Sequence, residues 1–324
     1  MKFQNIPYHI LKGIGFYREI PFRVNISTTS GAESPFYIAR RAARWGDSGF
    51  FANYFVALYH FFHATRLGFR PVIDMRNYKT LYSENNPVNG TTNAWNYYFL
   101  QPHDTAEAYG SGHFILSNAI EPPLKERPIR ETDTTCEFDP ESGPPMRRLA
   151  MADLSIRPEL RDAFDEEFSR LFRARKVLGI HFRGGDRRNP PPGHWRAVRQ
   201  EDIARAAEQI KECSPDAVFL ASDENGMAEL LSRKLELPVT QLPGFRLPPG
   251  SQAGVHWRDP RHRKIRKNHR YLLGLEVLKD AYFLSKCNWL VHGHSNVANA
   301  AIFFRGKPYE RKILVASGKP TSWK

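Results

Sequence analysis

One short segment, His181-Phe182-Arg183-Gly184-Gly185-Asp186, combines a cation with bare backbone in a way that suits an anion. It directly follows an apolar run that ends at Ile180. A guanidinium can fork onto two phosphate oxygens, and glycine lets the backbone approach a ligand closely because it has no Cβ. The segment therefore predicts a diphosphate site. An Arg–Asp pair that ties a surface turn is the alternative.

Two further polar clusters follow apolar runs in the same way. Ser222-Asp223-Glu224 comes after the run 217–221, and His294-Ser295-Asn296 comes after the run 289–291. Ser295 and Asn296 stand where a helix begins, so they can cap that helix. They can also offer a hydroxyl and backbone N–H groups to a phosphate, and both interpretations stay open.

The histidines of the last cluster could instead bind a metal ion. His292 and His294 are spaced i and i+2 at a strand end, so both imidazoles could lie on one face. No third ligand is evident, and the chain has no Asp-x-Asp to hold a divalent ion against a diphosphate. We therefore expect no metal and no other cofactor, with Arg183 neutralising the diphosphate.

The elements that must position these clusters are clearest in the second half. A helix follows Ser155, with Leu160, Phe164, Phe168 and Leu171 on one apolar stripe. Apolar strands at 177–180, 217–221, 239–242, 289–291 and 313–315 then alternate with helices near 200–212, 226–235 and 271–285. This alternation predicts a doubly wound parallel sheet, in which ligands bind at the carboxyl ends of the strands. The three polar clusters should meet there.

The first half predicts a smaller α/β unit. A strand at 22–26, a helix at 52–67 and a strand at 71–74 are expected, with a glycine loop (Gly46, Ser48, Gly49) opening the helix, where it too could meet substrate. Residues 77–102 should form an ordered loop. Prolines then accumulate up to Pro145, so we place the domains at 1–150 and 151–324.

Composition indicates which partners the protein binds and in which cellular compartment it lies. The chain has 324 residues and a formal net charge of +13, which favours anionic partners. Three widely spaced cysteines and the absence of a long apolar run indicate a cytoplasmic protein, and its basic surface would allow peripheral contact with the anionic inner face of a membrane. The basic run from Arg258 to Arg270 can be a solvated face, an acceptor or membrane contact, or a nucleic-acid contact.

These segments together resemble the fucosyltransferase superfamily that contains the rhizobial nodulation fucosyltransferase and the animal α-1,6-fucosyltransferase. The segment 180–186 is similar to the H-x-R-x-x-D motif of that family, and 218–223 to its apolar strand ending in T-D. The stretch from Leu278 to Val297 is similar to its D-x-x-x-L-S…S-S/N-V motif, and 46–74 to its glycine loop, helix and strand. The resemblance covers roughly half of the chain.

The resemblance implies a GT-B architecture of two Rossmann-like domains facing a central cleft, an acceptor domain followed by a nucleotide-sugar domain. It implies that Arg183 binds the β-phosphate, that His181 and Asp280 lie at a guanine, and that Ser295 or Asn296 lies near the diphosphate. A carboxylate such as Asp280 can accept from both guanine N1–H and the 2-amino group. A solvated helix residue is its alternative role.

The chain departs from the family at the general base. Eight positions after the motif arginine, where the animal enzyme has a glutamate, this chain has Pro191. Asp186 is the first candidate for the base and His194 the second, because an inverting transfer needs a group that takes the proton of the attacking hydroxyl.

The expected function is therefore that of an inverting, metal-independent transferase. It would move fucose or a related hexose from a GDP donor to a glycan or lipid-linked glycan in surface polysaccharide synthesis. Use of a UDP or CMP sugar is the alternative among enzymes. Outside enzymes, the alternative is a basic polyanion- or nucleic-acid-binding protein on a degenerate glycosyltransferase fold. We expect no nucleic acid as a partner.

Overall fold

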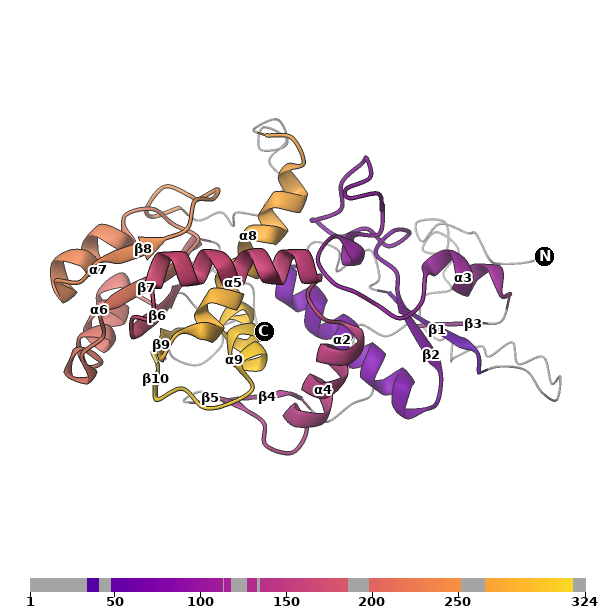
Figure 1. Ribbon diagram of the computed structural model, residues 1–324, viewed down its shortest axis with the longest axis horizontal. Helices are drawn as coiled ribbons and strands as arrows, with labels where there is room; N and C mark the ends of the chain where they lie inside the picture. The colour runs from indigo at the N-terminus through magenta and orange to yellow at the C-terminus, as the bar shows by residue number, and fades with distance from the viewer. Residues whose placement is uncertain are drawn as a thin grey trace, which may run out of the picture. The chain divides into compact units, whose positions relative to one another are not determined.

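The computed structural model of the chain describes residues 34–40, 48–112, 114–117, 127–132, 135–185, 198–251 and 266–316 (Figure 1). The chain divides into two compact units. One comprises Met1–Lys125 and Leu149–Arg157, and the other Glu126–Arg148 and Pro158–Lys324. The chain thus crosses from one unit to the other within α4 (Gly143–Asp153).

A five-stranded parallel sheet forms the centre of the second unit, as the sequence predicts. Its strand order is β10-β9-β6-β7-β8. The strands are β6 (Val177–Phe182), β7 (Ala217–Ser222), β8 (Val239–Gln241), β9 (Trp289–His292) and β10 (Arg311–Leu314). Each lies within two residues of the predicted strand. The order reverses at β6, so the carboxyl ends of β6 and β9 lie at the point where such sheets bind ligands.

Helices cover both faces of this sheet, which confirms the doubly wound architecture. The helices are α5 (Pro158–Phe172), α6 (Gln200–Glu208), α7 (Met227–Leu235), α8 (His269–Lys286) and α9 (Asn296–Arg305). On one face, apolar side chains of α6 and α7 pack with alternate strand residues such as Ile180 and Leu220. On the other face, Phe219 contacts Phe283 of α8 and Phe172 of α5, with ring centroids 5.3 and 6.1 Å apart.

The predicted helix at 200–212 is shorter in the structure. It ends at Glu208 and is followed by a short 3-10 turn at Lys211–Cys213.

The first unit contains a small parallel sheet of order β2-β1-β3. Its elements are β1 (Phe36–Ala39), α2 (Phe50–Arg66), β2 (Arg70–Ile73), α3 (Thr105–Gly110) and β3 (Phe114–Leu116). The helix and strand predicted at 52–67 and 71–74 are confirmed. The sequence pattern missed β1 and β3. The strand predicted at 22–26 lies outside the described residues.

Aromatic packing holds the predicted ordered loop, 77–102, against α2. Trp95 stacks on Tyr54 of α2 with ring centroids 5.7 Å apart, and its indole N–H donates to the carbonyl of Leu100 at 3.0 Å. The loop also contains a short 3-10 turn, Ala94–Tyr97.

The proline-rich region that the sequence pattern left without elements contains an antiparallel hairpin of the second unit. Its strands are β4 (Ile129–Glu131) and β5 (Cys136–Phe138), with Glu131 opposite Cys136. Both strands have three residues.

In the part of the chain that the structure describes, no helix combines the length and apolar character needed to cross a bilayer.

Candidate functional site

Strand register brings two of the predicted polar clusters together. β6 and β9 are parallel neighbours, and His181 lies opposite His292. Arg183 and His294 each lie two residues further along the chain, so both leave the sheet at the same carboxyl edge. Neighbouring strands are roughly 4.8 Å apart. The strand register therefore places the backbone of Arg183 and of His294 at the edge where β6 and β9 end.

The face on which these side chains lie follows from the alternation of the strand. A Cβ built at Gly179 would lie 3.1 Å from Leu284 of α8 and from Cys287, so position 179 faces α8. His181 is two residues on and shares that face. Asp280 belongs to the same helix. His181 and Asp280, which the family resemblance assigns to one guanine, thus lie on one side of the sheet.

Two buried imidazoles at this edge have nitrogens without hydrogen-bond partners. His181 is 5% exposed and His292 is fully buried, and His181 Nδ1 and His292 Nε2 have no hydrogen-bond partner among the described residues. Burial lowers the pKa of His181 to about 3, and the charges of His292 and Arg183 add to the shift. Burial likewise lowers the pKa of His292 to about 4. Both rings are neutral near pH 7, so they can hydrogen-bond a ligand but cannot neutralise its charge.

The glycine turn after Arg183 is braced by the third polar cluster. Gly184 N–H donates to Asp223 Oδ1 and Gly185 N–H donates to Glu224 Oε1, each at 2.9 Å. Glu224 is fully buried, and its own N–H donates to Ser222 Oγ at 3.1 Å. The two glycine N–H groups are therefore engaged by carboxylates. Ser222, Asp223 and Glu224 shape the turn that presents Arg183.

The turn also needs glycine for space. A Cβ on Gly184 would overlap both carboxylate oxygens of Glu224, with Oε2 at 2.7 Å. Gly184→Ala should therefore lower the free energy of unfolding by about 2–4 kcal/mol, because it overpacks the site and disturbs a buried hydrogen bond. Denaturant unfolding measures this loss.

A matched control for this variant lies in α3. Gly110 has a negative φ and no atom within 4 Å of its Cβ position, so Gly110→Ala should leave stability unchanged or raise it slightly. Equal stability of the Gly184→Ala variant and the wild type would show that the turn tolerates a side chain.

Helix α9 begins beside His294 and is capped by Ser295. Ser295 Oγ accepts from Val297 N–H at 3.2 Å, which confirms the capping role, and Asn296 is the first helical residue. The helix has ten residues and no acidic residue in its first turn. Its N-terminus therefore adds a partial positive charge at this edge.

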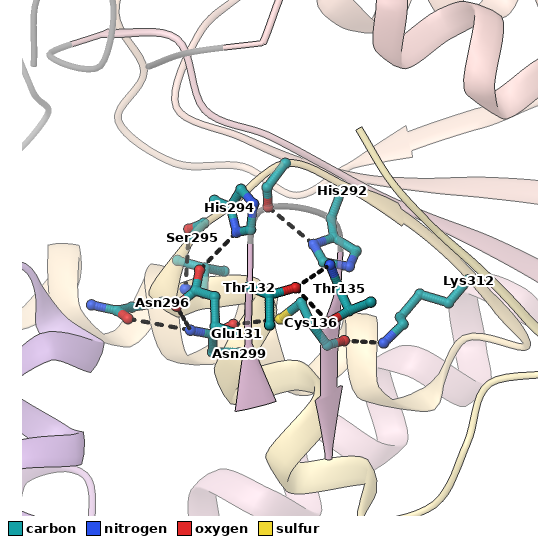
Figure 2. A network of polar contacts seen from close by, with 12 residues as sticks. Glu131, Thr132, Thr135, Cys136, His292, His294, Ser295, Asn296, Asn299 and Lys312 are labelled. Carbon is teal, nitrogen blue, oxygen red and sulfur yellow. Dashed lines mark hydrogen bonds and ion pairs between the residues drawn. The ribbon is translucent and has the colours of Figure 1, made fainter. Parts of the chain in front are cut away.

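A carboxylate that the sequence analysis did not single out orients His294. His294 Nδ1 lies 2.8 Å from Glu131 Oε1, on the β4–β5 hairpin (Figure 2). Glu131 Oε2 also accepts from Asn299 Nδ2 at 3.4 Å. Burial acts to raise the pKa of Glu131, but the hydrogen bonds and charge of His294 outweigh it and lower that pKa. Glu131 is 163 residues from His294, and no local pattern marks it.

The hairpin itself is anchored to the same helix and sheet. Cys136 Sγ donates to Asn299 Oδ1 at 2.8 Å, and Lys312 of β10 binds both the Cys136 carbonyl and the carboxylate of Glu137. Among the described residues, no group of three His, Cys, Asp or Glu side chains is arranged to hold a metal ion.

Asp280 is a carboxylate without a hydrogen-bond donor among the described residues. It is partly exposed on α8, and the charges near it are those of Arg246, Glu276 and Lys279. Burial raises its pKa to about 7, while the charge of Arg246 acts in the opposite direction.

Some predicted site residues lie outside the described residues, namely Asp186, His194 and Gly46, together with most of the basic run that begins at Arg258. Ser48 and Gly49 are described. Gly49 is the N-cap of α2 and gives it no side-chain cap, and the Ser48 carbonyl accepts from Asn53 Nδ2 at 3.1 Å. The described part of the predicted glycine loop, Ser48 and Gly49, therefore leads into α2.

No protein-family profile matches the chain, and no curated protein matches it. A solved structure, NodZ alpha-1,6-fucosyltransferase soaked with GDP-fucose, is similar to it with 19% identity over 84% of this chain and 92% of that chain, at a TM-score of 0.52. The chain has the fold of that fucosyltransferase. The α/β architecture implied by the family resemblance is thereby confirmed.

Two other similar structures have lower TM-scores. Se-Met fucosyltransferase NodZ from Bradyrhizobium is 17% identical over 83% of this chain and 92% of that chain, with a TM-score of 0.48. POFUT1 in complex with GDP-fucose is 9% identical over 89% of this chain and 99% of that chain, with a TM-score of 0.43.

Proposed function

We propose that this protein is a glycosyltransferase that moves fucose or a related hexose from a GDP-sugar to a glycan acceptor. The observation that carries the proposal is that Arg183, the N-terminus of α9 and two buried imidazoles lie at the carboxyl edge of β6 and β9, each imidazole having one nitrogen without a partner among the described residues. Such an edge of a doubly wound sheet is where a nucleotide's phosphates bind. The fold shared with a fucosyltransferase soaked with GDP-fucose supports the choice of donor.

The charges at this edge suit a diphosphate leaving group. Because His181 and His292 are neutral, Arg183 and the α9 N-terminus supply the positive charge. We assign the diphosphate to Arg183 and to Ser295 or Asn296. The transfer then needs no divalent ion to neutralise the GDP that leaves.

The proposed reaction is a single displacement that inverts the anomeric carbon. The acceptor hydroxyl oxygen forms a bond to C1 of the sugar while the bond from C1 to the β-phosphate oxygen breaks, and GDP carries away the electron pair. The proton of the hydroxyl passes to a general base, for which Asp186 and then His194 are the candidates. Ser222 and Asp223 act indirectly, by holding the turn that follows Arg183.

The acceptor side of the proposal rests on the first unit. We assign the acceptor to this unit, including the glycine loop at Gly46, Ser48 and Gly49, and the donor to the second unit, in place of the division into 1–150 and 151–324 that the sequence predicts. A glycan or lipid-linked glycan of a surface polysaccharide is the proposed acceptor. The net charge of +13 supports a cytoplasmic enzyme that contacts an anionic membrane peripherally.

A nucleotide screen tests the proposal directly. Thermal unfolding is measured with GDP, UDP, CMP and ADP, each in the presence of EDTA. We expect GDP to raise the melting temperature and the others not to, because a ligand at 100 times its Kd adds about 2.7 kcal/mol to stability.

The other outcomes of the screen select the alternatives. Stabilisation by UDP or CMP instead of GDP would replace the donor. Tight binding of DNA without binding of any nucleotide would favour the polyanion-binding function.

A further inference from the structure

One carboxylate of the second unit, that of Glu131 on β4, lies at the centre of a polar network at the start of α9. Its Oε1 lies 2.8 Å from His294 Nδ1, and its Oε2 accepts from Asn299 Nδ2 at 3.4 Å (Figure 2). The side chain of His294 is fully buried, and Asn299 is 6% exposed. His294 precedes the N-cap Ser295, and Asn299 lies in the first turn of α9. The hairpin thus holds the start of α9 at two positions.

The charge of Glu131 fixes the direction of the hydrogen bonds around it. Burial acts to raise the pKa of this carboxyl, but the hydrogen bonds from His294 and Asn299 outweigh it and lower the pKa. Glu131 is therefore ionised near pH 7 and can only accept hydrogen bonds. It follows that His294 carries a proton on Nδ1, and that Asn299 turns its amino group, and not its carbonyl, toward Glu131.

The orientation of Asn299 is passed on to Asn296, the first residue of α9. Asn299 Nδ2 has two hydrogens, one for Glu131 and one for Asn296 Oδ1, which lies 3.5 Å away. At the other end of the same amide, Cys136 Sγ donates to Asn299 Oδ1 at 2.8 Å. Burial raises the pKa of the Cys136 thiol to about 12, so the thiol keeps the proton that it donates. Both ends of the Asn299 amide therefore specify one orientation.

Asn296 consequently presents a donor on the side away from the network. Its amide oxygen is turned toward Asn299 (Figure 2), and its Nδ2 has no acceptor among the described residues. Asn296 is half-buried at the N-terminus of α9, where the helix adds a partial positive charge. An amide that presents Nδ2 can donate to a phosphate oxygen, whereas one that presents Oδ1 would repel it. An asparagine can adopt either orientation, so its neighbours decide between them.

We propose that Glu131 is a positioning residue of the donor site, which orients Asn299 and through it Asn296, so that Asn296 Nδ2 donates to the diphosphate. This inference rests on the proposed function, because it requires a diphosphate at the N-terminus of α9. Glu131 itself does not contact the donor.

Two single variants test the proposal through the affinities of the full-length protein for GDP and for guanosine, measured by titration calorimetry. Asn296→Ala removes the donor and should weaken GDP binding about tenfold, the effect of one hydrogen bond to a charged group. Glu131→Gln keeps the size of the side chain but offers one acceptor in place of two. His294 has the shorter contact, so the new carbonyl should face His294 and the new amino group should face Asn299. The amides of Asn299 and Asn296 then reverse, and GDP binding should weaken about tenfold while guanosine binding stays unchanged.

A double variant shows whether Glu131 acts through Asn296. If it does, the protein with both Glu131→Gln and Asn296→Ala should bind GDP no more weakly than Asn296→Ala alone, because the effects of residues in one network do not add. Glu137→Gln is the matched control. Glu137 lies on the same hairpin, but its carboxylate binds Lys312 at 2.8 Å, so this variant should bind GDP like the wild type.

The outcomes separate this inference from the proposed function. Losses that multiply to about a hundredfold in the double variant would show that Glu131 acts independently of Asn296. Unchanged GDP affinity in either single variant, or an equal loss of guanosine binding, would also contradict the assigned role. Each of these results overturns the inference and leaves the proposed function intact. If the wild type bound no GDP, the proposed function would fail and this inference with it.

Discussion

Replacing Arg183 by alanine is expected to lower the rate of sugar transfer by about 10²–10³-fold, because it removes the cation that stabilises charge on the departing diphosphate. The side chain follows β6 directly, and the neighbouring imidazoles of His181 and His292 are neutral near pH 7 and cannot replace it. The rate of GDP release from GDP-fucose measures the loss. The affinities for GDP and for guanosine, measured by titration, show which part of the donor is affected. Arg183→Ala should weaken the binding of GDP but not that of guanosine, which has no phosphate.

Two variants show whether the loss belongs to the guanidinium. Arg183→Lys keeps the charge but not the fork, so it should recover part of the rate. Arg175 is exposed and precedes the amino end of β6, so Arg175→Ala should keep full activity. An Arg183→Ala protein that unfolds like the wild type yet retains near-full activity would remove Arg183 from the mechanism.

Replacing Asp280 by asparagine is expected to weaken GDP binding about 100-fold, on the order of 3 kcal/mol, because the site loses a charged acceptor for two guanine donors. The same change should improve binding of xanthosine diphosphate. Xanthine carries a carbonyl where guanine has the 2-amino group, and an asparagine amide can donate to it. Competition between GDP and xanthosine diphosphate for the protein measures this change in nucleotide preference. The gain for xanthine shows that the variant is folded.

The raised pKa of Asp280 adds a pH test of the same contact. With a pKa of about 7, the free carboxyl is protonated below pH 7 and must lose its proton before it accepts from both guanine donors. GDP affinity should therefore be constant above pH 7 and fall by up to tenfold per unit below it. The Asp280→Asn variant should lack this slope. An equal slope in both proteins would assign the titration to another group.

Local sequence was sufficient to predict the larger sheet. Continuous apolar runs such as Val177–Ile180 and Ala217–Ala221 indicate buried strands, and the helices between them have a clear 3.6-residue period. Strands β1, β3, β4 and β5 were not predicted from the sequence. Their stability comes from pairing with distant strands, which no short window of sequence contains.

The sequence by itself determined which residues stand at the carboxyl ends of the strands, because a polar residue after an apolar run is a local fact. It therefore identified Arg183, Ser222-Asp223 and Ser295-Asn296. Only the tertiary structure decided how those groups are used. It engages the Gly184 and Gly185 N–H groups with carboxylates 39 residues away and joins Glu131 to His294 across 163 residues. The choice of partner depends on which strands and loops pack together, and burial then makes each such pairing strong.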